Sequence, residues 1–570
     1  MSKLANHLRA YKRDCILAPL FKLLEALLEL LVPLVVAAIV DKGIATGDVS
    51  YIITHVLLML LLAILGLSVS ITSQFFSARA ASSFARDVKQ SLFDHIQSLS
   101  TSDRDKIGSS TLITRMSSDM TQVQAGVNMA LRLLLRSPFI VFGATIMAFT
   151  VDVKAALIFA VVLPLLILIV WVLMAISLPR YRSVQRNLDS ITASVRENLS
   201  GVRVIRAFNL EEKEKGKFSA INKLMLRTQL LSAKVSVLTN PLTSVVINGG
   251  IIALLYTGAI RVDSGSLTQG EVIALVNYMS QILVELIKLA NLIITITRAL
   301  ASAKRVEAIF AIEPSMKDGT LTSFSSSEEA ICFENVTFSY NEAASPALQD
   351  ISFRVKKGST LGIIGGTGSG KSTLSSLILR EYDASSGSIK IFSNDIKDYS
   401  LSFLHKHISA ALQKARLFSG TIRSNLLFAN NEASDKDIEE ALKASQAWEF
   451  VEKKGLDSAV EALGLNFSGG QRQRLSVARA LISKPDILIL DDSSSALDYA
   501  TDRKLREALA KIDATKVIIS QRAASLMHAD NILVLDNGRL ISQGTHSELL
   551  SSSPLYREIF YSQFKKEEIK

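Results

Sequence analysis

The sequence predicts a membrane protein of two unlike halves: an all-helical transmembrane domain followed by a soluble α/β domain of the P-loop type. Three observations predict this fold class. The first half contains about six apolar stretches near the length of about 20 residues that crosses a bilayer. The second half alternates short β-rich runs with helical runs. That half also contains a G-x-x-x-x-G-K-[ST] motif between a predicted strand and a predicted helix.

Composition excludes several other classes of protein. The chain has 570 residues, too many for one core, and 49% of them are hydrophobic, with a mean hydropathy of +0.31. Cys15 and Cys332 are its two cysteines, which excludes a disulfide framework and a cysteine-based zinc site. The net charge of +10 fits lysines and arginines on the cytoplasmic side of a membrane, so we expect no nucleic acid partner.

The sequence pattern of residues 1–14 predicts a short helix at the membrane surface. They are basic and amphipathic, with Leu4, Leu8 and Tyr11 on one side. A signal peptide is the alternative, but no small-residue cleavage site closes the apolar run that follows. We therefore expect an interfacial elbow helix ahead of a transmembrane domain over residues 15–305.

The connections between the apolar stretches predict the orientation of the transmembrane domain. Long regions rich in arginine and lysine, 79–127 and 179–235, alternate with short connections of little positive charge. The positive-inside bias places these regions and the N-terminus in the cytoplasm, as helices that extend the spans. The six spans are expected at 15–40, 52–76, 128–150, 155–178, 236–259 and 271–297.

Ionisable residues inside the spans allow two interpretations. Glu25 and Glu29 lie on one face of the first span with Lys22, and Glu285 lies three residues before Lys288 in the sixth. They could line a polar cavity for the transported substrate, or satisfy one another as structural ion pairs. Arg132 and Arg136, near the cytoplasmic end of the third span, are expected to extend to the lipid headgroups.

A polar, serine-rich segment predicts the domain boundary. We expect a linker over residues 306–328 and the second domain over residues 329–570. The P-loop motif of that domain predicts binding of ATP and Mg²⁺, because its freed backbone N–H groups and helix N-terminus form a cradle for phosphate. Lys371 would reach the β- and γ-phosphates, and Ser372 would bind Mg²⁺. The residues of the expected cradle are Gly365, Gly366, Thr367, Gly368, Ser369, Gly370, Lys371, Ser372 and Thr373.

Four further motifs complete this domain. Residues 331–340 are expected to form an edge strand whose terminal Tyr340 could stack on an adenine ring. Gln413 follows a predicted strand and could reach Mg²⁺, while Asp491 ends an apolar strand in the Walker B arrangement and could hold the metal. The fourth motif is a glycine-rich helix start that could bind a second phosphate, formed by Ser468, Gly469, Gly470 and Gln471.

Together these motifs resemble the ATP-binding domain of ABC transporters, in which this S-G-G-Q signature stands between Walker A and Walker B. Asp498 matches the D-loop of that family, and residues 197–208 resemble the cytoplasmic region of its exporter branch. The resemblance implies that two half-transporters dimerise and enclose ATP between one Walker A and the opposite signature. It also implies coupling helices, expected near residues 110–117 and 208–212, that transmit closure to the spans.

Two positions depart from the family pattern. Asp492 stands where the family usually has the glutamate that polarises water, and Gln521 stands where it usually has histidine. The aspartate carboxylate withdraws by about 1 Å, which can cost about 10²-fold in rate. Glutamine can neither become a cation nor shuttle a proton. These positions predict that this chain binds ATP at a weakly hydrolytic site, while its intact signature completes the site of a different partner chain. Such a chain resembles the degenerate-site subunit of heterodimeric bacterial multidrug exporters.

We therefore expect a subunit of a heterodimeric exporter that moves small amphiphilic compounds or drugs outward across the plasma membrane. Its expected partners are a different half-transporter, the lipid bilayer and the substrate. Its N-terminus and ATPase domain are expected in the cytoplasm. Two alternatives stay open: a homodimeric exporter or lipid flippase with a slow aspartate base, and an ATP-gated channel or regulatory subunit.

Overall fold

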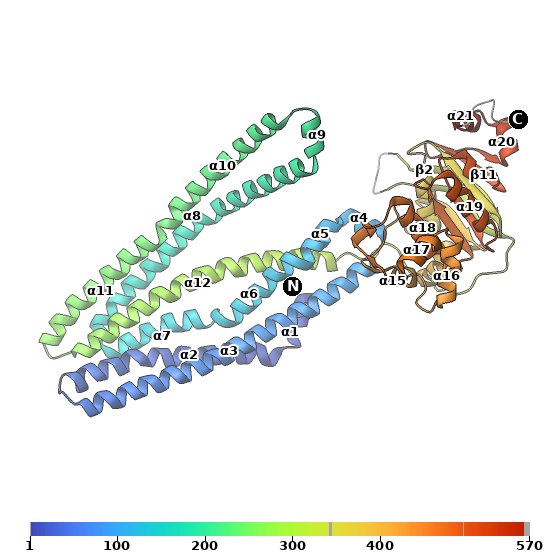
Figure 1. Cartoon of the computed structure of the whole chain (residues 1–570). Coiled ribbons are helices and arrows are strands. Elements are labelled where there is room, and N and C mark those ends of the chain that lie inside the picture. The colour runs from blue at the N-terminus through green and yellow to red at the C-terminus, as the bar shows by residue number, and fades with distance from the viewer. Residues whose placement is uncertain (1, 341–344, 494, 564–570) are drawn as a thin grey trace. The chain divides into compact units, whose positions relative to one another are not determined.

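The computed structural model describes residues 2–340, 345–493 and 495–563 (Figure 1). The chain divides into two units. The first comprises Met1–His95 and Ser110–Ile312, and the second comprises Ile96–Ser109 and Glu313–Lys570.

The first unit is helical throughout its described residues, and six of its helical segments are long and apolar enough to cross a membrane. The predicted six-span fold class is therefore confirmed. Two of these segments continue as single helices into the predicted cytoplasmic regions. The helices are α1 (Ser2–Arg9), α2 (Lys12–Ala38), η1 (Ile39–Ile44), α3 (Val49–Ser98), α5 (Ser109–Thr114), η2 (Arg115–Asp119), α6 (Met120–Leu133), α7 (Arg136–Val151), α8 (Val153–Ser200), α9 (Val202–Ala207), α10 (Glu211–Val237), α11 (Thr239–Asp263) and α12 (Gln269–Phe310).

Local capping explains where several of these helices begin. The Thr268 hydroxyl accepts a hydrogen bond from the Glu271 backbone, and the Glu271 carboxylate accepts one from the Thr268 N–H, which starts α12. Asp152 caps α8 in the same position and pairs with Arg261 of α11 at 2.5 Å. The apolar core joins α2, α7, α8, α11 and α12. Because α12 runs to Phe310, the first residues of the expected linker are helical.

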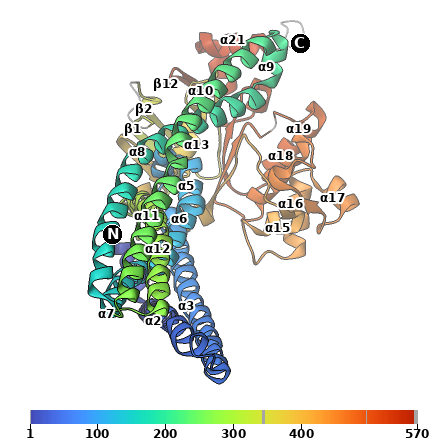
Figure 2. The same cartoon turned by 90° about the vertical axis from the view of Figure 1, so that its left-hand side faces the viewer.

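Helices α8 and α10 form a long antiparallel hairpin with α9 at its tip (Figures 1 and 2). No described residue of α9 is buried. Apolar side chains are exposed at this tip, including Leu199 at 72% and Phe208 at 71%. The tip therefore presents an unpartnered apolar surface in the first unit.

The second unit contains a six-stranded sheet in the order β12-β11-β3-β10-β9-β6 and a four-stranded sheet in the order β2-β1-β4-β5. The neighbours β11, β3, β10, β9 and β6 are parallel, and β12 is antiparallel to β11. The strands are β1 (Glu329–Phe338), β2 (Leu348–Lys356), β3 (Thr360–Gly365), β4 (Ser386–Ile391), β5 (Asn394–Asp395), β6 (Ile408–Ala411), β7 (Gly420–Thr421), β8 (Ala459–Val460), β9 (Ile487–Asp491), β10 (Thr515–Ile519), β11 (Asn531–Asp536) and β12 (Arg539–Gly544).

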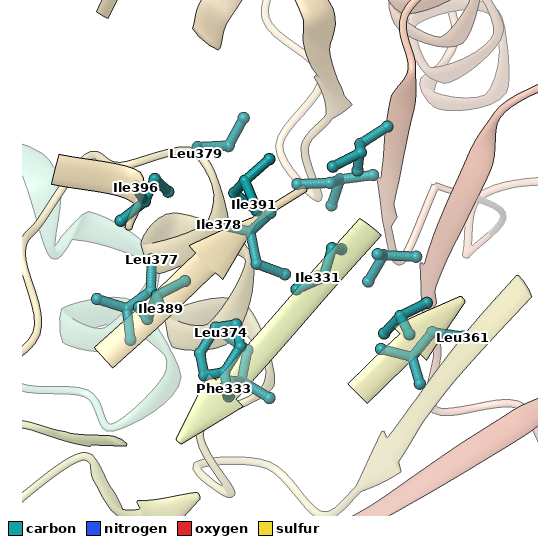
Figure 3. Packing of buried hydrophobic residues seen from close by; sticks show 14 of the residues in the cluster. Ile331, Phe333, Leu361, Leu374, Leu377, Ile378, Leu379, Ile389, Ile391 and Ile396 are labelled. Atoms are coloured by element: carbon teal, nitrogen blue, oxygen red, sulfur yellow. The ribbon is translucent and has the colours of Figure 1, made fainter. Parts of the chain in front are cut away.

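The predicted edge position of the strand before Tyr340 was wrong. Strand β1 pairs with β2 on one side and with β4 on the other, so both of its edges are used. Its residues Ile331 and Phe333 are buried in a core that also contains apolar side chains of β4 and α13, as Figure 3 shows. The burial of Ala330, Ile331, Cys332 and Phe333 accounts for the apolar run near the start of the strand.

The second unit also contains helices. One of them is α4, which precedes the segment expected as the first coupling helix and groups with this unit. The helices are α4 (Thr101–Ile107), α13 (Lys371–Ile378), η3 (Ile396–Asp398), α14 (Leu401–His407), α15 (Ile422–Leu427), α16 (Asp435–Ala444), α17 (Trp448–Lys454), η4 (Ala462–Gly464), α18 (Gly469–Leu481), α19 (Tyr499–Ala510), η5 (Ala523–Ser525), α20 (His546–Ser552) and α21 (Pro554–Gln563).

Candidate functional site

A pocket of about 390 Å³ lies where the parallel strands of the larger sheet end. The carboxyl ends of parallel strands meet at one edge of a sheet, so the residues that follow β3, β6, β9 and β10 converge there. The lining consists of Tyr340, Ala347, Thr367, Gly368, Ser369, Gly370, Lys371, Ser372, Thr373, Gln413, Asp491, Asp492, Ile519, Ser520 and Gln521.

The glycine-rich loop forms one wall of this pocket and starts helix α13. Gly370 has a φ of 96°, a conformation that favours glycine, and a Cβ on Gly365 would lie 2.2 Å from the carbonyl oxygen of Leu535. The Lys371 amine donates to the carbonyl oxygens of Gly366 at 2.6 Å and Gly365 at 3.0 Å. Burial lowers the pKa of Lys371. A phosphate entering the loop would supply the amine with a charged partner in place of neutral carbonyls.

Two adjacent carboxylates, Asp491 and Asp492, form the opposite wall. Burial raises the pKa of both groups, and a hydrogen bond from Ser372 offsets part of this effect at Asp491. Asp492 has a φ of 46°, and its backbone N–H donates to the Ile519 carbonyl. The Gln413 amide donates to Asp492 Oδ2 at 3.4 Å. The loop after β6 and the end of β9 therefore lie side by side at the pocket, as the pairing of these two strands requires.

Gln521 lines the same pocket as Asp492, and a distant helix supports its loop. Gln563 in α21 donates to the Gln521 carbonyl at 2.8 Å and accepts a hydrogen bond from the Ala523 N–H at 2.9 Å. The neighbouring Arg522 donates to the Ser495 carbonyl at 3.3 Å, and its charge offsets part of the rise that burial causes in the pKa of Asp492. The sequence analysis missed Gln563, because no local signal links residues 42 positions apart.

Tyr340 lies at the mouth of the pocket and contacts a second tyrosine that the sequence analysis also missed. The Tyr340 hydroxyl donates to Thr373 Oγ1 at 3.1 Å, and its ring lies edge-on to that of Tyr382 with centroids 5.3 Å apart. Tyr382 donates in turn to Asp105 Oδ2 of α4 at 2.6 Å. Burial and this bond raise the pKa of Tyr382. Within the second unit, α4 is thus linked to the wall where an adenine would bind.

The signature residues lie apart from this pocket. Ser468 caps α18, donating from its N–H to Gln471 Oε1 at 3.0 Å and accepting from the Gln471 N–H at 3.3 Å. The pocket lining, as the described residues define it, includes none of Ser468, Gly469, Gly470, Gln471 and Asp498. Ser468 and Asp498 are exposed. Gln473, which was not predicted from the sequence, joins α18 to the D-loop by accepting a hydrogen bond from the Ala496 N–H at 3.0 Å.

The pocket's donor set fits a magnesium nucleotide. No cluster of three histidine, cysteine or acidic side chains occurs within the described ranges, so a metal held by protein groups alone is not indicated there. Ser372, Gln413 and Asp491 instead line one pocket as a hydroxyl, an amide and a carboxylate. Mg²⁺ at phosphates uses one or two carboxylates together with other oxygen ligands.

In the first unit, the ionisable residues of the spans form one connected cluster. Lys22 pairs with Glu25 at 2.5 Å and Lys288 with Glu285 at 2.7 Å, as the ion-pair interpretation predicts. The prediction that Arg136 extends to the headgroups was wrong. Its side chain is 6% exposed and binds Glu29 and Glu285 at 2.6 Å each. Arg136 begins α7 directly after the break at residues 134–135, which turns its side chain inward.

Comparison with known proteins identifies the family. Residues 15–286 match the family model of the ABC transporter transmembrane region, and residues 348–495 match the family model described as ABC transporter. An uncharacterized ABC transporter ATP-binding protein of Bacillus subtilis (strain 168), YfiB, is 38% identical over 89% of this chain and 88% of its own length. The chain belongs to the ABC transporter family.

Other relatives refine this assignment. An ATP-dependent lipid A-core flippase of Vibrio vulnificus (strain YJ016) is 30% identical to this ABC transporter over 88% of the chain and 86% of the flippase. The structure of a bacterial Atm1-family ABC exporter with ATP bound matches the fold with a TM-score of 0.79, at 23% identity and 98% coverage of both chains. This ABC transporter therefore has the fold of an exporter-type half-transporter, and it is an ATPase-driven, multi-pass membrane translocase.

Proposed function

We propose that this half-transporter is the degenerate-site subunit of a heterodimeric exporter. The observation that carries the proposal is the meeting of Asp492 and Gln521 in one pocket. The two departures from the family pattern thus weaken the same reaction, because one shortens the carboxylate and the other removes an ionisable side chain. The remaining pocket residues keep the groups expected to bind ATP, so this chain would bind the nucleotide and hydrolyse it slowly.

In this proposal Tyr340 stacks on adenine and residues 365–373 hold the phosphates. Ser372, Gln413 and Asp491 would hold Mg²⁺, which would neutralise charge on the phosphates when bound. Asp492 and Gln521 would mark the slow site. Ser468 to Gln471 and Asp498 would face the partner's nucleotide.

Two exposed surfaces of this chain support the presence of a partner chain. The signature helix begins at the exposed Ser468, away from the pocket of its own unit. The apolar tip around α9, with Phe208 71% exposed, has no partner within the described part of the first unit. Exposed apolar surface of this kind marks a protein interaction site. The proposed partner is a different half-transporter whose own signature would cover this chain's ATP.

We assign the proposed exporter to the plasma membrane, with its N-terminus and ATPase domain in the cytoplasm, from the charge bias of the loops. Its proposed cargo is a small amphiphilic compound or drug. The domain division proposed is an elbow helix at 1–14, a transmembrane domain at 15–305, a linker at 306–328 and an ATP-binding domain at 329–570. Glu25, Glu29, Glu285 and Lys288 belong to the proposed substrate region.

A homodimeric lipid flippase is the second candidate. It is favoured by the lipid A-core flippases among the relatives, which are 30% identical over most of the chain. In that case Asp492 would serve as the catalytic base at both sites. An ATP-gated channel or regulatory subunit would instead conduct ions or bind ATP without turnover.

The test compares the ATPase activity of the chain purified alone with that of the chain co-expressed with the half-transporter encoded nearest to it. We expect negligible activity alone and strong activity together. Asp492→Asn in this chain should then change the joint activity little, whereas removal of the partner's Walker B carboxylate should abolish it. Robust activity of the chain alone, lost in Asp492→Asn, would establish the homodimer instead. Ion conductance without coupled turnover would establish the channel.

A further inference from the structure

A polar pocket of about 410 Å³ lies between the first and sixth spans of the first unit. Helix α2 contributes Glu29 with the apolar Val32 and Val36, and α12 contributes Asn277 and Gln281. With Glu285 of α12, the pocket thus combines two carboxylates and two amides with an apolar wall, inside segments apolar enough to cross a membrane. Small-molecule sites commonly have this composition, with a few placed polar groups in an apolar surround.

The charged groups behind this pocket balance one another. Three cations and three carboxylates make a connected set of ion pairs, so the set carries no net charge. Its members are Lys22, Glu25, Glu29, Arg136, Glu285 and Lys288. Arg132, which is close enough to act electrostatically on Lys22, is positive. The surroundings therefore provide no excess negative charge to attract a cationic ligand.

Two residues that line the pocket each carry a hydrogen-bond acceptor that the protein does not use. Glu29 gives Oε2 to Arg136 at 2.6 Å and is 41% exposed, and no hydrogen bond to its Oε1 occurs among the described residues. Gln281 Oε1 is buried and lacks a partner within the same described ranges. Glu285 differs, because Arg136 and Lys288 occupy its Oε1 and Ser137 occupies its Oε2.

These observations specify the chemistry of a ligand. The free acceptors require hydrogen-bond donors, and the side-chain amides of Asn277 and Gln281 supply donors in return. A hydroxyl group both donates and accepts, and it carries no charge that would unbalance the ion pairs. The buried Gln281 Oε1 left without a donor costs about 1–3 kcal/mol, so a hydroxyl that reaches it would contribute to affinity. The Glu29 side chain is 41% exposed, so its free oxygen would contribute less.

We propose that this pocket binds an uncharged, hydroxyl-rich headgroup, such as the sugar of a glycolipid, with the ligand's apolar chain along Val32 and Val36. The proposal rests on the proposed export function and narrows its amphiphilic cargo to one class. Glu29 and Gln281 are the specificity-determining residues. The ion pairs around Arg136 keep Glu29 from acting as an isolated anion.

The test measures equilibrium binding to the full transporter, with its partner, in nanodiscs without ATP. Three probes share one fluorescent short-chain tail and carry a glucosyl, a quaternary ammonium or a phosphate headgroup. We expect the glucosyl probe to bind about tenfold more tightly than either charged probe. Gln281→Leu should weaken glucosyl binding about tenfold. Its matched control, Asn248→Leu, replaces an exposed amide of α11 outside the pocket and should leave binding unchanged.

Glu29→Gln tests whether the negative charge of Glu29 or its hydrogen bonding determines ligand binding. Glutamine would keep its carbonyl oxygen on Arg136 and present its NH2 group to the pocket, where a hydroxyl oxygen can accept from it, so binding of the glucosyl probe should stay within about threefold of the original. Tighter binding of the ammonium probe, lost in Glu29→Gln, would overturn the proposal, because Glu29 would then act as an uncompensated anion. Equal binding of all three probes would overturn it as well. Because these measurements need no ATP, failure of the heterodimer proposal would alter turnover and leave the order of affinities unchanged.

Discussion

At the scale of single residues, Asp492 and Gln521 are the side chains that we propose limit the rate of ATP hydrolysis by this chain. Both line the nucleotide pocket, and Asp492 keeps a pKa raised by burial, so the carboxylate retains the basicity of a proton acceptor. Its shorter side chain sets the carboxylate back by about 1 Å from the glutamate position. A displacement of this size can cost about 10²-fold in rate, or about 2.7 kcal/mol of barrier.

We expect Asp492→Glu alone to raise turnover at this chain's own site only modestly, by less than about tenfold, because Gln521 still cannot shuttle a proton. The double variant Asp492→Glu with Gln521→His should recover about 10²-fold or more. The measurement is single-turnover ATP hydrolysis in the complex, with the partner's Walker B carboxylate removed so that one site reports. Full recovery by Asp492→Glu alone would show that position 521 contributes little. Gln521→His alone provides the control for the second change.

Arg136 is the residue on which the polar cluster of the spans depends. Arg136→Met should destabilise the protein by about 3–5 kcal/mol, because it leaves the buried Glu285 and the half-exposed Glu29 without their main countercharge. Lys288→Met is the matched control, since the Lys288 side chain is 42% exposed and Glu285 keeps its ion pair with Arg136. Thermal denaturation followed by size-exclusion chromatography measures both. Equal stability of the two variants would contradict a central role for Arg136.

At the scale of elements, the C-terminal helix α21 fixes the loop that carries Gln521. The Gln563 side chain both donates to and accepts from this loop. We expect Gln563→Ala to lower the unfolding free energy by about 1–2 kcal/mol, at about 1 kcal/mol for each lost hydrogen bond. Hydrogen exchange at the Ala523 amide should also speed up by about tenfold.

Gln543→Ala, on the exposed face of strand β12, is the control for this loop. It removes an amide of the same type from the same unit without touching residues 521–523, so exchange at Ala523 should not change. Faster exchange at Ala523 in both variants would mean that any such substitution destabilises the whole second unit, and that the contact from α21 has no specific role.

At the scale of the whole molecule, the exposed tip around α9 is the surface expected to transmit ATP-driven closure between chains. Phe208→Ser removes a side chain that is 71% exposed, so the fold should tolerate it. We expect the complex to bind ATP normally but to lose most of its substrate-stimulated ATPase activity. Ile541→Ser, which removes another exposed apolar side chain, should keep that activity. Loss of ATP binding in Phe208→Ser would point to misfolding instead.

Much of the molecule follows from local sequence. The six spans follow from runs of apolar residues, and the phosphate loop follows from glycine spacing between a strand and a helix. The convergence of Gln413, Asp491 and Gln521 was also predictable, because each follows a strand of one parallel sheet. These features depend on composition and spacing within a few tens of residues, which sequence alone contains.

Tertiary structure decided the rest. Sequence could not reveal that Arg136 binds Glu285, which lies 149 positions away, or that Tyr382 reaches Asp105 across 277 positions. It also misplaced β1, because a central and an edge strand can share one apolar pattern. A side chain's neighbours depend on the packing of whole elements. The sequence therefore determined which groups this exporter carries, and the fold decided which of them are paired, which are buried and which remain free to bind.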